Sequence, residues 1–443
     1  MDITNETITR KKIFLLWFPL AVMWIFMAVE QPGVNAIIAR LNNPKLHLAA
    51  YGVMFPLALI IEAPIIQMLT AATALTDGRR NYTTLLQFMH RWAFGLTVLH
   101  LVVALTPLYK LLVGNLLGVP EDVVEISRTA FIIMFPWTPT IGYRRLWQGV
   151  LIRYGKTKQI SYIMFIRLFA TLGTLFLAYR LGWEQGAYAG AAALIAGVIA
   201  GMISAYLFAR PVVLSLDEEA EDKIISRRDL MKFYTPLILT SVITFLARPM
   251  LNFGIARAAF PLESLAVWPV VISIMFIFRS MALAYQEVAV ALLKENADEK
   301  LMRSFALMLA VGTGGAFLVF VLSPAGPFWF DTVAGLSDDL LAFTMLPALL
   351  LAFMPVLSGF ISWFRGLLIY RGKTTRIAQA VGINTGSLVI MVTLFPLLFE
   401  IPGAVLAAAA FSLSLFFEVV FLAFATRETK IVKAGLKSVI TDK

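Results

Sequence analysis

The chain of 443 residues contains no cysteine, only three histidines and few charged side chains. The lack of cysteine excludes disulfides and thiolate metal sites, and the scattered His47, His90 and His100 show no metal-ligand spacing. Charged residues make up 14% of the chain, whereas average soluble proteins carry about 25%. Because the sequence shows neither a nucleophile triad nor a metal cluster, we expect a protein that is not an enzyme and needs no cofactor.

What the chain has in excess is apolar length. Hydrophobic residues make up 60% of it, and the mean hydropathy is +0.82, which is more apolar surface than a soluble chain of this size can bury. Runs such as Ile13–Ala36 and Phe94–Leu117 match the roughly 20 residues that cross a bilayer. No cleavage site follows Arg10-Lys11-Lys12, so we expect the first run to stay as a membrane helix.

The sequence repeats itself at an offset of 217 positions (249 − 32 = 217). The offset relates Pro32 to Pro249, Asn35 to Asn252, and Gly155-Lys156-Thr157 to Gly372-Lys373-Thr374. It is close to half of the chain length, so the protein consists of one unit written twice. In a polytopic membrane protein, such a repeat is typical of a transporter that holds its substrate between two related halves.

The repeat and the apolar runs predict an all-α integral membrane protein with twelve transmembrane helices in two pseudo-symmetric six-helix bundles. The predicted helices of the first half are 12–40, 46–75, 83–114, 121–153, 158–181 and 186–212. Those of the second half are 232–258, 262–293, 300–323, 337–370, 375–398 and 402–426. The predicted domains are an N-terminal bundle (1–212), a cytoplasmic linker (213–231), a C-terminal bundle (232–427) and a basic tail (428–443).

The net charge of +10 has an uneven distribution along the predicted spans. Arg10-Lys11-Lys12, Arg79-Arg80 and Arg227-Arg228 lie on one side, whereas Glu121-Asp122 and Asp338-Asp339 lie on the other. Because basic residues collect on the cytoplasmic side of membrane proteins, we expect both termini and the linker to face the cytoplasm. The expected location is the cell (inner or plasma) membrane.

Charged side chains inside the predicted spans are the strongest functional signal, since each costs about 2.5–3.5 kcal/mol at a helix centre. Arg248 lies in the seventh helix, at the repeat position of Gln31, and Arg279 lies in the eighth. Planar guanidinium groups suit the binding of an anion. The predicted substrate-binding residues are Arg248, Arg279, Asn35, Asn252 and Gln31. The alternative is that the buried charges form ion pairs that only hold helices together.

Two acidic residues are candidates for ion coupling. Glu30 lies in the first helix, and Glu287 lies nearer the cytoplasmic end of the eighth. A buried carboxylate without full pairing exchanges protons near neutral pH, so we predict that these residues carry a coupling proton or sodium ion. Pro32 and Pro249 are predicted to kink the first and seventh helices beside them.

The repeated Gly-Lys-Thr motif has the wrong spacing for a nucleotide site. A P-loop needs four residues between its glycines, but five separate Gly149 from Gly155. We therefore predict a structural turn here, and transport driven by a gradient or by substrate rather than by ATP hydrolysis.

These segments resemble the multidrug/oligosaccharidyl-lipid/polysaccharide (MOP) exporter superfamily, which includes the MATE multidrug exporters. The resemblance covers the whole chain, with Val119-Pro120-Glu121-Asp122 opening the fourth helix and Gly-x5-Gly-Lys-Thr closing the fourth and tenth. Within the superfamily, the chain is most similar to the progressive ankylosis (ANK) family. That likeness rests on Pro19-Leu20, Glu30-Gln31, Asn35, Ile38-Ala39, Leu48-Ala49-x-Tyr51-Gly52, Pro236-Leu237, Arg248-Pro249, Asn252 and Gln286-Glu287.

The resemblance implies a V-shaped pair of bundles that alternate access by rocking. ANK-type members are associated with export of small anions such as pyrophosphate, nucleotides or citrate. MATE members export organic cations against sodium or protons and place an acidic residue in the first helix, a role that Glu30 matches in kind. Arg248, however, would repel a cationic drug.

Our leading hypothesis is therefore a secondary transporter, monomeric in the lipid bilayer, that exports a small anionic solute and binds no nucleic acid. A MATE-type cation antiporter, a lipid-linked flippase and a non-transporting scaffold remain as alternatives.

Overall fold

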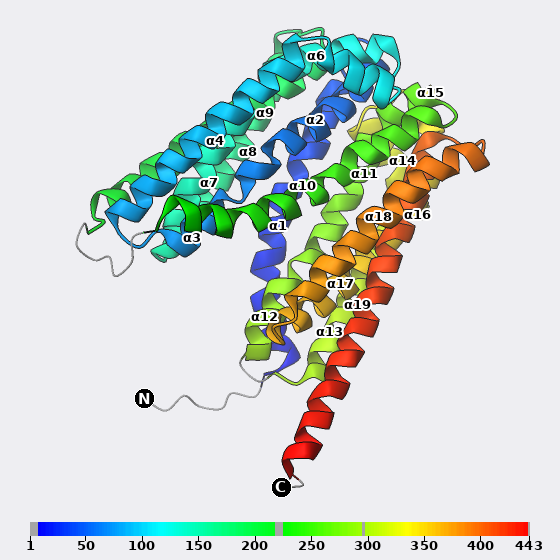
Figure 1. The fold of residues 1–443 in the computed structure, drawn as a ribbon. Coiled ribbons are helices and arrows are strands. Elements are labelled where there is room, and N and C mark those ends of the chain that lie inside the picture. The colour runs from blue at the N-terminus through cyan, green and yellow to red at the C-terminus, as the bar shows by residue number, and fades with distance from the viewer. Residues whose placement is uncertain (1–7, 218–224, 295–296, 442–443) are drawn as a thin grey trace.

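The computed structural model describes residues 8–217, 225–294 and 297–441, and it shows two halves built from corresponding helices (Figure 1). The first half comprises α1 (Arg10–Ile38), α2 (Pro44–Ile66), α3 (Met68–Leu75), α4 (Arg79–Leu105), α5 (Leu108–Lys110), the π-helix η1 (Leu111–Leu116), α6 (Glu121–Ile133), α7 (Trp137–Arg153), α8 (Thr157–Arg180) and α9 (Gly186–Leu214).

The second half contains α10 (Arg227–Arg257), α11 (Pro261–Leu283), α12 (Tyr285–Lys294), α13 (Glu299–Leu322), α14 (Ala325–Phe328), the π-helix η2 (Trp329–Val333), α15 (Asp338–Leu341), α16 (Met345–Leu351), α17 (Phe353–Tyr370), α18 (Thr374–Leu398) and α19 (Gly403–Thr441). Part of the predicted linker, residues 218–224, lies outside the described residues, as do the side chains of the predicted tail.

The predicted fold class is confirmed. Eleven helices of the described chain are long and apolar enough to cross a membrane. The predicted span that is not among these eleven is the fourth, 121–153. It is broken between α6 and α7 at Phe135-Pro136, so its two pieces have only 13 and 17 residues. Local signals recur at the repeat offset: Asn43 and Phe260 both take positive φ directly before a proline that begins a helix.

The Gly-Lys-Thr motifs form turns, as predicted. Gly155 and Gly372 have φ of +70° and +68° at the ends of α7 and α17, and Thr157 and Thr374 begin the next helices. Glycine takes this left-handed conformation without steric cost, and it commonly follows the last turn of a helix. Neither motif is flanked by a strand, so the structural turn replaces any nucleotide-binding role.

The first helix of each half crosses to the other half at the end of the spans where the chain begins, here called the basic end. Trp17 on α1 packs against Phe305 on α13 and donates from Nε1 to the Met281 carbonyl at 2.9 Å. Tyr234 on α10 packs against Phe88 on α4 and donates to the Pro64 carbonyl at 2.8 Å. Figure 1 shows these two helices spanning the space between the bundles.

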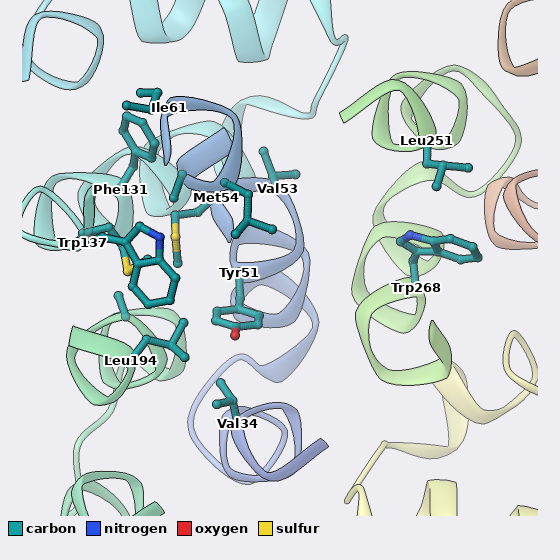
Figure 2. Close-up of a cluster of buried hydrophobic side chains, with 14 of the residues drawn as sticks. Val34, Tyr51, Val53, Met54, Ile61, Phe131, Trp137, Leu194, Leu251 and Trp268 are labelled. Atoms are coloured by element: carbon teal, nitrogen blue, oxygen red, sulfur yellow. The ribbon is translucent and has the colours of Figure 1, made fainter. Parts of the chain in front are cut away.

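The hydrophobic core runs through both halves, with α2 and α11 at its centre. Figure 2 shows Tyr51 and Met54 of α2 facing Trp137 of α7, while Trp268 of α11 lies on the opposite side with Leu251 of α10. Gly52 allows α2 and α11 to approach closely, because a Cβ there would lie 3.2 Å from the Pro269 ring. The two halves are therefore joined along α2 and α11.

Candidate functional site

The junction of the halves is held by two asparagines at repeat-related positions. Asn35 on α1 donates to the Pro269 carbonyl at 2.8 Å and to Ser273 Oγ at 3.1 Å. Asn252 on α10 donates to the Gly52 carbonyl at 2.9 Å. Both asparagines are at most 2% exposed. Their Nδ2 atoms bind groups of the other half, whereas Asn35 Oδ1 has no hydrogen-bond partner among the described residues. Substrate binding by the two asparagines stays a prediction.

A proline explains one of these contacts. Pro56 has no N–H, so the carbonyl of Gly52 one turn earlier on α2 lacks its helical donor. The amide of Asn252 supplies that donor, as expected for a freed carbonyl buried in a membrane protein. At the repeat position of Pro56 stands Ser273, whose hydroxyl accepts from Asn35 instead.

Two arginines tie the halves together at the end opposite the basic end. Arg40, at the end of α1, donates to the Thr332 carbonyl in η2 at 2.5 Å. Its repeat equivalent Arg257, at the end of α10, donates to the carbonyls of Leu116 and Leu117 beside η1, at 2.7 and 2.6 Å. Each arginine satisfies carbonyls at the end of a π-helix in the other half, so the contacts between the halves are dense at this end.

Glu30 is paired within the first half. It forms an ion pair with Arg167 of α8, and Thr171 donates to its other carboxylate oxygen at 2.9 Å. Glu30 is 5% exposed, and it lines a pocket of about 180 Å³ between α1 and α8. The expectation of a carboxylate without full pairing is therefore wrong. Arg167, and not Arg248, is its partner.

A second buried acid lies deeper in the first half. Glu62 on α2 is 2% exposed and accepts from Trp137 Nε1 at 2.5 Å. Its charge interacts with Arg144 and Arg145 of α7. Arg144 is only 2% exposed. Its Nε and Nη1 have no hydrogen-bond partner among the described residues.

The second half has a more complete network. Glu418 on α19 is 1% exposed and accepts from Arg365 at 2.5 Å and from Asn384 at 2.6 Å. Arg279 donates from Nε to Ser358 Oγ at 2.8 Å, and its guanidinium lies 5.8 Å from the Phe411 ring centre. Arg279 is therefore turned into its own bundle.

Arg248 lies where the halves face each other. Its side chain is exposed although it sits within the span of α10. Its charge interacts with Glu62 and Tyr51 of the first half and with Arg279 of the second. Tyr51 in turn donates to Gln31 at 2.7 Å. Arg248 and Gln31 both interact with Tyr51, and their role in substrate binding stays a prediction.

Electrostatic interactions link nine residues into one group, which we call the central charge set. It comprises Arg144, Arg145, Arg167, Arg248, Arg279 and Arg365 with Glu30, Glu62 and Glu418. Six arginines and three glutamates give a formal charge of 6 − 3 = +3. Glu287 is exposed on α12 and lies outside this set, and Pro32 and Pro249 lie within continuous helices.

Sequence reasoning did not select the residues that complete this set. The repeat contains the missing signal, because polar residues recur at equivalent depths with changed chemistry. Glu62 is the repeat equivalent of Arg279, Gln148 of Arg365, and Arg167 of Asn384. A search for polar residues at both members of each repeat pair finds Glu62, Arg167 and Arg365, but it misses Arg144 and Glu418, whose repeat equivalents are Ile361 and Gly201.

The fold and this interior define a class: a polytopic membrane protein of two repeat-related bundles, with charged side chains inside the bundles and another, Arg248, where they face each other. The comparisons specify the class further. The MatE family model matches residues 19–177. A sequence search against curated proteins finds no match.

Solved structures share the fold over nearly the whole chain. A multidrug resistance MATE family transporter of the MOP superfamily, in an inward-facing conformation, has a TM-score of 0.70 at 15% identity and covers 96% of this chain and 99% of its own. A MOP superfamily transporter from Pyrococcus furiosus has 0.63 at 17%, with 97% and 100% covered. The lipid II flippase MurJ has 0.63 at 14%, with 96% and 91% covered. The predicted MATE-like fold is confirmed over nearly the whole chain, and the resemblance to the MatE family is confirmed over residues 19–177. The nearer likeness to ANK stays a prediction.

Proposed function

We propose that this protein is a secondary active transporter that exports a small anion by alternating access, with Arg248 at the centre of the binding site. The observation that carries the proposal is the +3 formal charge of the central charge set. Arginine does not discharge by losing its proton, and an unbalanced charge is costly where it is buried, as it is at Arg144. A bound anion offsets that cost while it is being carried.

Three arginines are available for this role. Arg144, Arg145 and Arg248 form no ion pair among the described residues, whereas Arg167 and Arg365 each pair with a glutamate. Arg145 Nε, like Nε and Nη1 of Arg144, has no hydrogen-bond partner among the residues that the structure describes. A planar donor fork of this kind matches carboxylate and phosphate oxygens.

The same charges disfavour a cationic substrate. In a MATE-type cation antiporter, a free carboxylate in the first helix would attract the drug or the coupling ion, but Glu30 is engaged by Arg167 and Thr171. The solved structure from Pyrococcus furiosus is described as having a binding pocket of reverse polarity that suggests a different function. A change of pocket polarity on this fold thus has a precedent in that protein.

The ANK-like hypothesis supplies the substrate class: pyrophosphate, nucleotides or citrate. In the predicted orientation, both termini, the linker and the basic end face the cytoplasm. The opposite end, where Arg40 and Arg257 connect the halves, is then the outer gate. The cell membrane, monomeric state and coupling to a proton or sodium gradient belong to the same proposal.

The test is uptake of labelled pyrophosphate, ATP, citrate and an organic cation into proteoliposomes, with and without pH and sodium gradients. We expect gradient-dependent uptake of at least one anion and none of the cation. Anion uptake should be abolished in Arg248→Ala and should remain low in Arg248→Lys, because the bidentate fork of the guanidinium is lost. Arg91→Ala, at an exposed arginine within the span of α4, is the matched control and retains flux. Cation uptake that survives in Arg248→Ala contradicts the proposal.

A further inference from the structure

A second basic pocket lies in the second half, apart from the central charge set. It has a volume of about 190 Å³ and is lined by residues of α13, α17 and α19 at the basic end. Its cationic residues are Lys300, Arg303, Arg371 and Arg427. The apolar spans of these three helices begin or end here, at Glu299, Tyr370 and Arg427. The pocket, which we call the α13–α17–α19 groove, thus lies at the level where a bilayer changes from acyl chains to headgroups.

The groove is organised around one buried arginine. The Arg371 side chain is 5% exposed; it donates to both carboxylate oxygens of Glu299, at 2.9 and 3.1 Å, and to the Thr426 carbonyl at 3.0 Å. These bonds fix the floor of the groove. Lys300 and Arg303 are exposed on the α13 side, and Arg427 is exposed on the α19 side. Cations therefore face the groove from two helices, with apolar rings between them.

In the first half, aromatic side chains occupy the positions that are repeat-equivalent to this groove. The repeat equivalent of Ala423 is Tyr206, and that of Phe364 is Trp147. Their rings lie 5.0 Å apart, and Trp147 Nε1 donates to the hydroxyl of Tyr82 at 3.2 Å. Aromatic rings thus fill this place in the first half.

The second half has replaced a large side chain with a small one and neutral residues with basic ones. Alanine stands for Tyr206, and Lys300, Arg303 and Arg371 stand for Thr83, Leu86 and Tyr154. Glu299 also stands for Tyr82. The smaller side chain opens space, and the charged residues add a net charge of 3 − 1 = +2. Packing of these helices requires neither change, since aromatic rings pack at the equivalent place in the first half.

We propose that the α13–α17–α19 groove binds a phosphate-bearing anion, namely the headgroup of an anionic membrane phospholipid. Basic pockets between membrane helices at the cytoplasmic side suit phospholipid headgroups. The apolar wall formed by Trp363, Phe364 and Leu367 lies along the acyl chains. A soluble phosphate compound shares the headgroup chemistry but not the acyl chains, so experiment separates the two sources.

The test measures thermal unfolding of the purified full-length protein in neutral detergent by tryptophan fluorescence. Phosphatidylglycerol, phosphatidylcholine, glycerol 3-phosphate and inorganic phosphate are titrated separately. We expect phosphatidylglycerol to raise the Tm by about 2 °C or more, with little effect from the other three. In Lys300→Ala/Arg303→Ala, the concentration of phosphatidylglycerol that gives half of the shift rises about fivefold or more.

Ala423→Tyr fills the groove as the first half does, and it retains every charge. We expect it to lose the lipid-induced shift as well. Arg210→Ala, which removes the repeat equivalent of Arg427, is the control and keeps the shift. Equal shifts with phosphatidylcholine, or unchanged shifts in both groove variants, overturn the site. A shift with soluble phosphate that disappears in the groove variants overturns the lipid assignment in favour of a soluble anion.

Discussion

The two halves of this protein have the same helices but treat buried charge differently. In the second half, Arg365 on α17 is matched by Glu418 on α19, which also accepts from Asn384 on α18. All three members come from neighbouring helices of one bundle. Cation, acid and amide therefore form a closed network that leaves little charge for a ligand.

The repeat-equivalent positions in the first half are Gln148, Gly201 and Arg167. The acid has become a glycine, and the cation has moved to the helix that carried the amide. The side chain of Arg144 occupies the space, because a Cβ on Gly201 would lie 3.2 Å from Arg144 Cδ. Within the central charge set, the first half then has a formal charge of 3 − 2 = +1, and the second half, with Arg248 and Arg279, has 3 − 1 = +2. The comparison therefore gives the Arg365–Glu418 pair a stabilising role, whereas Arg144, Arg145 and Arg248 form no ion pair among the described residues.

We expect the largest loss of stability from a substitution at Glu418, which would remove the difference in charge pairing between the halves. Removal of one partner of a buried pair leaves an uncompensated charge and costs about 3–5 kcal/mol. Glu418→Ala should therefore lower the Tm strongly or prevent expression. Glu418→Gln with Arg365→Gln should recover most of the loss, since neither charge then remains alone. Thermal unfolding in detergent measures both, and Glu121→Gln, at an exposed acid, is the control.

A substitution at Arg144 should have the opposite stability effect. This arginine is buried without an ion pair among the described residues, so Arg144→Met removes a desolvated charge and leaves the Tm unchanged or higher. Anion flux should fall about tenfold or more, because tenfold corresponds to roughly 1.4 kcal/mol, within the range for one charged hydrogen bond. Arg365→Met is the matched variant and should destabilise. A fall in Tm for Arg144→Met contradicts a ligand-binding role.

The two paired glutamates give a third contrast. Glu30 borders a pocket between α1 and α8, whereas Glu418 is 1% exposed inside its bundle. We expect Glu30→Gln to cost about 2 kcal/mol, since Arg167 loses its ionic partner but reaches the pocket. Flux should continue without dependence on pH or sodium. Proteoliposome assays at imposed gradients measure this, and retained gradient dependence in Glu30→Gln rules out coupling through this residue.

The sequence predicted the helices and the repeat well, because apolar length, proline and glycine act locally. It did not predict which charges would meet. The carboxylate of Glu30 lies next to Arg167, 137 positions away, and nothing in the spacing of either helix indicates this contact. Asn35 and Asn252 were predicted to bind substrate because they lie beside the repeat-matched prolines, but the Asn252 amide binds a carbonyl freed by Pro56, and the Asn35 amide binds Pro269 and Ser273. Such choices depend on how α1 and α10 cross between the halves, which only the tertiary structure shows.

We expect the smallest losses of stability at the two repeat-related asparagines, where the two halves also differ. Asn252→Ala leaves the Gly52 carbonyl without a donor, because Pro56 supplies no N–H to it. An unsatisfied buried carbonyl costs about 1–2 kcal/mol. Asn35→Ala should cost less, since residue 273 is a serine whose N–H can serve the Pro269 carbonyl within α11.

The decisive experiment adds Pro56→Ala to each variant and compares the Tm values. In Asn252→Ala, the new N–H at position 56 reaches the freed carbonyl, so the double variant should be more stable than the single one. In Asn35→Ala, the same change should give no rescue, because Asn35 bonds to Pro269 and Ser273 on α11 and not to α2. Equal effects of Pro56→Ala in both backgrounds would show that the proline acts through the stiffness of α2. The asparagine would then hold the halves together without compensating for the missing donor.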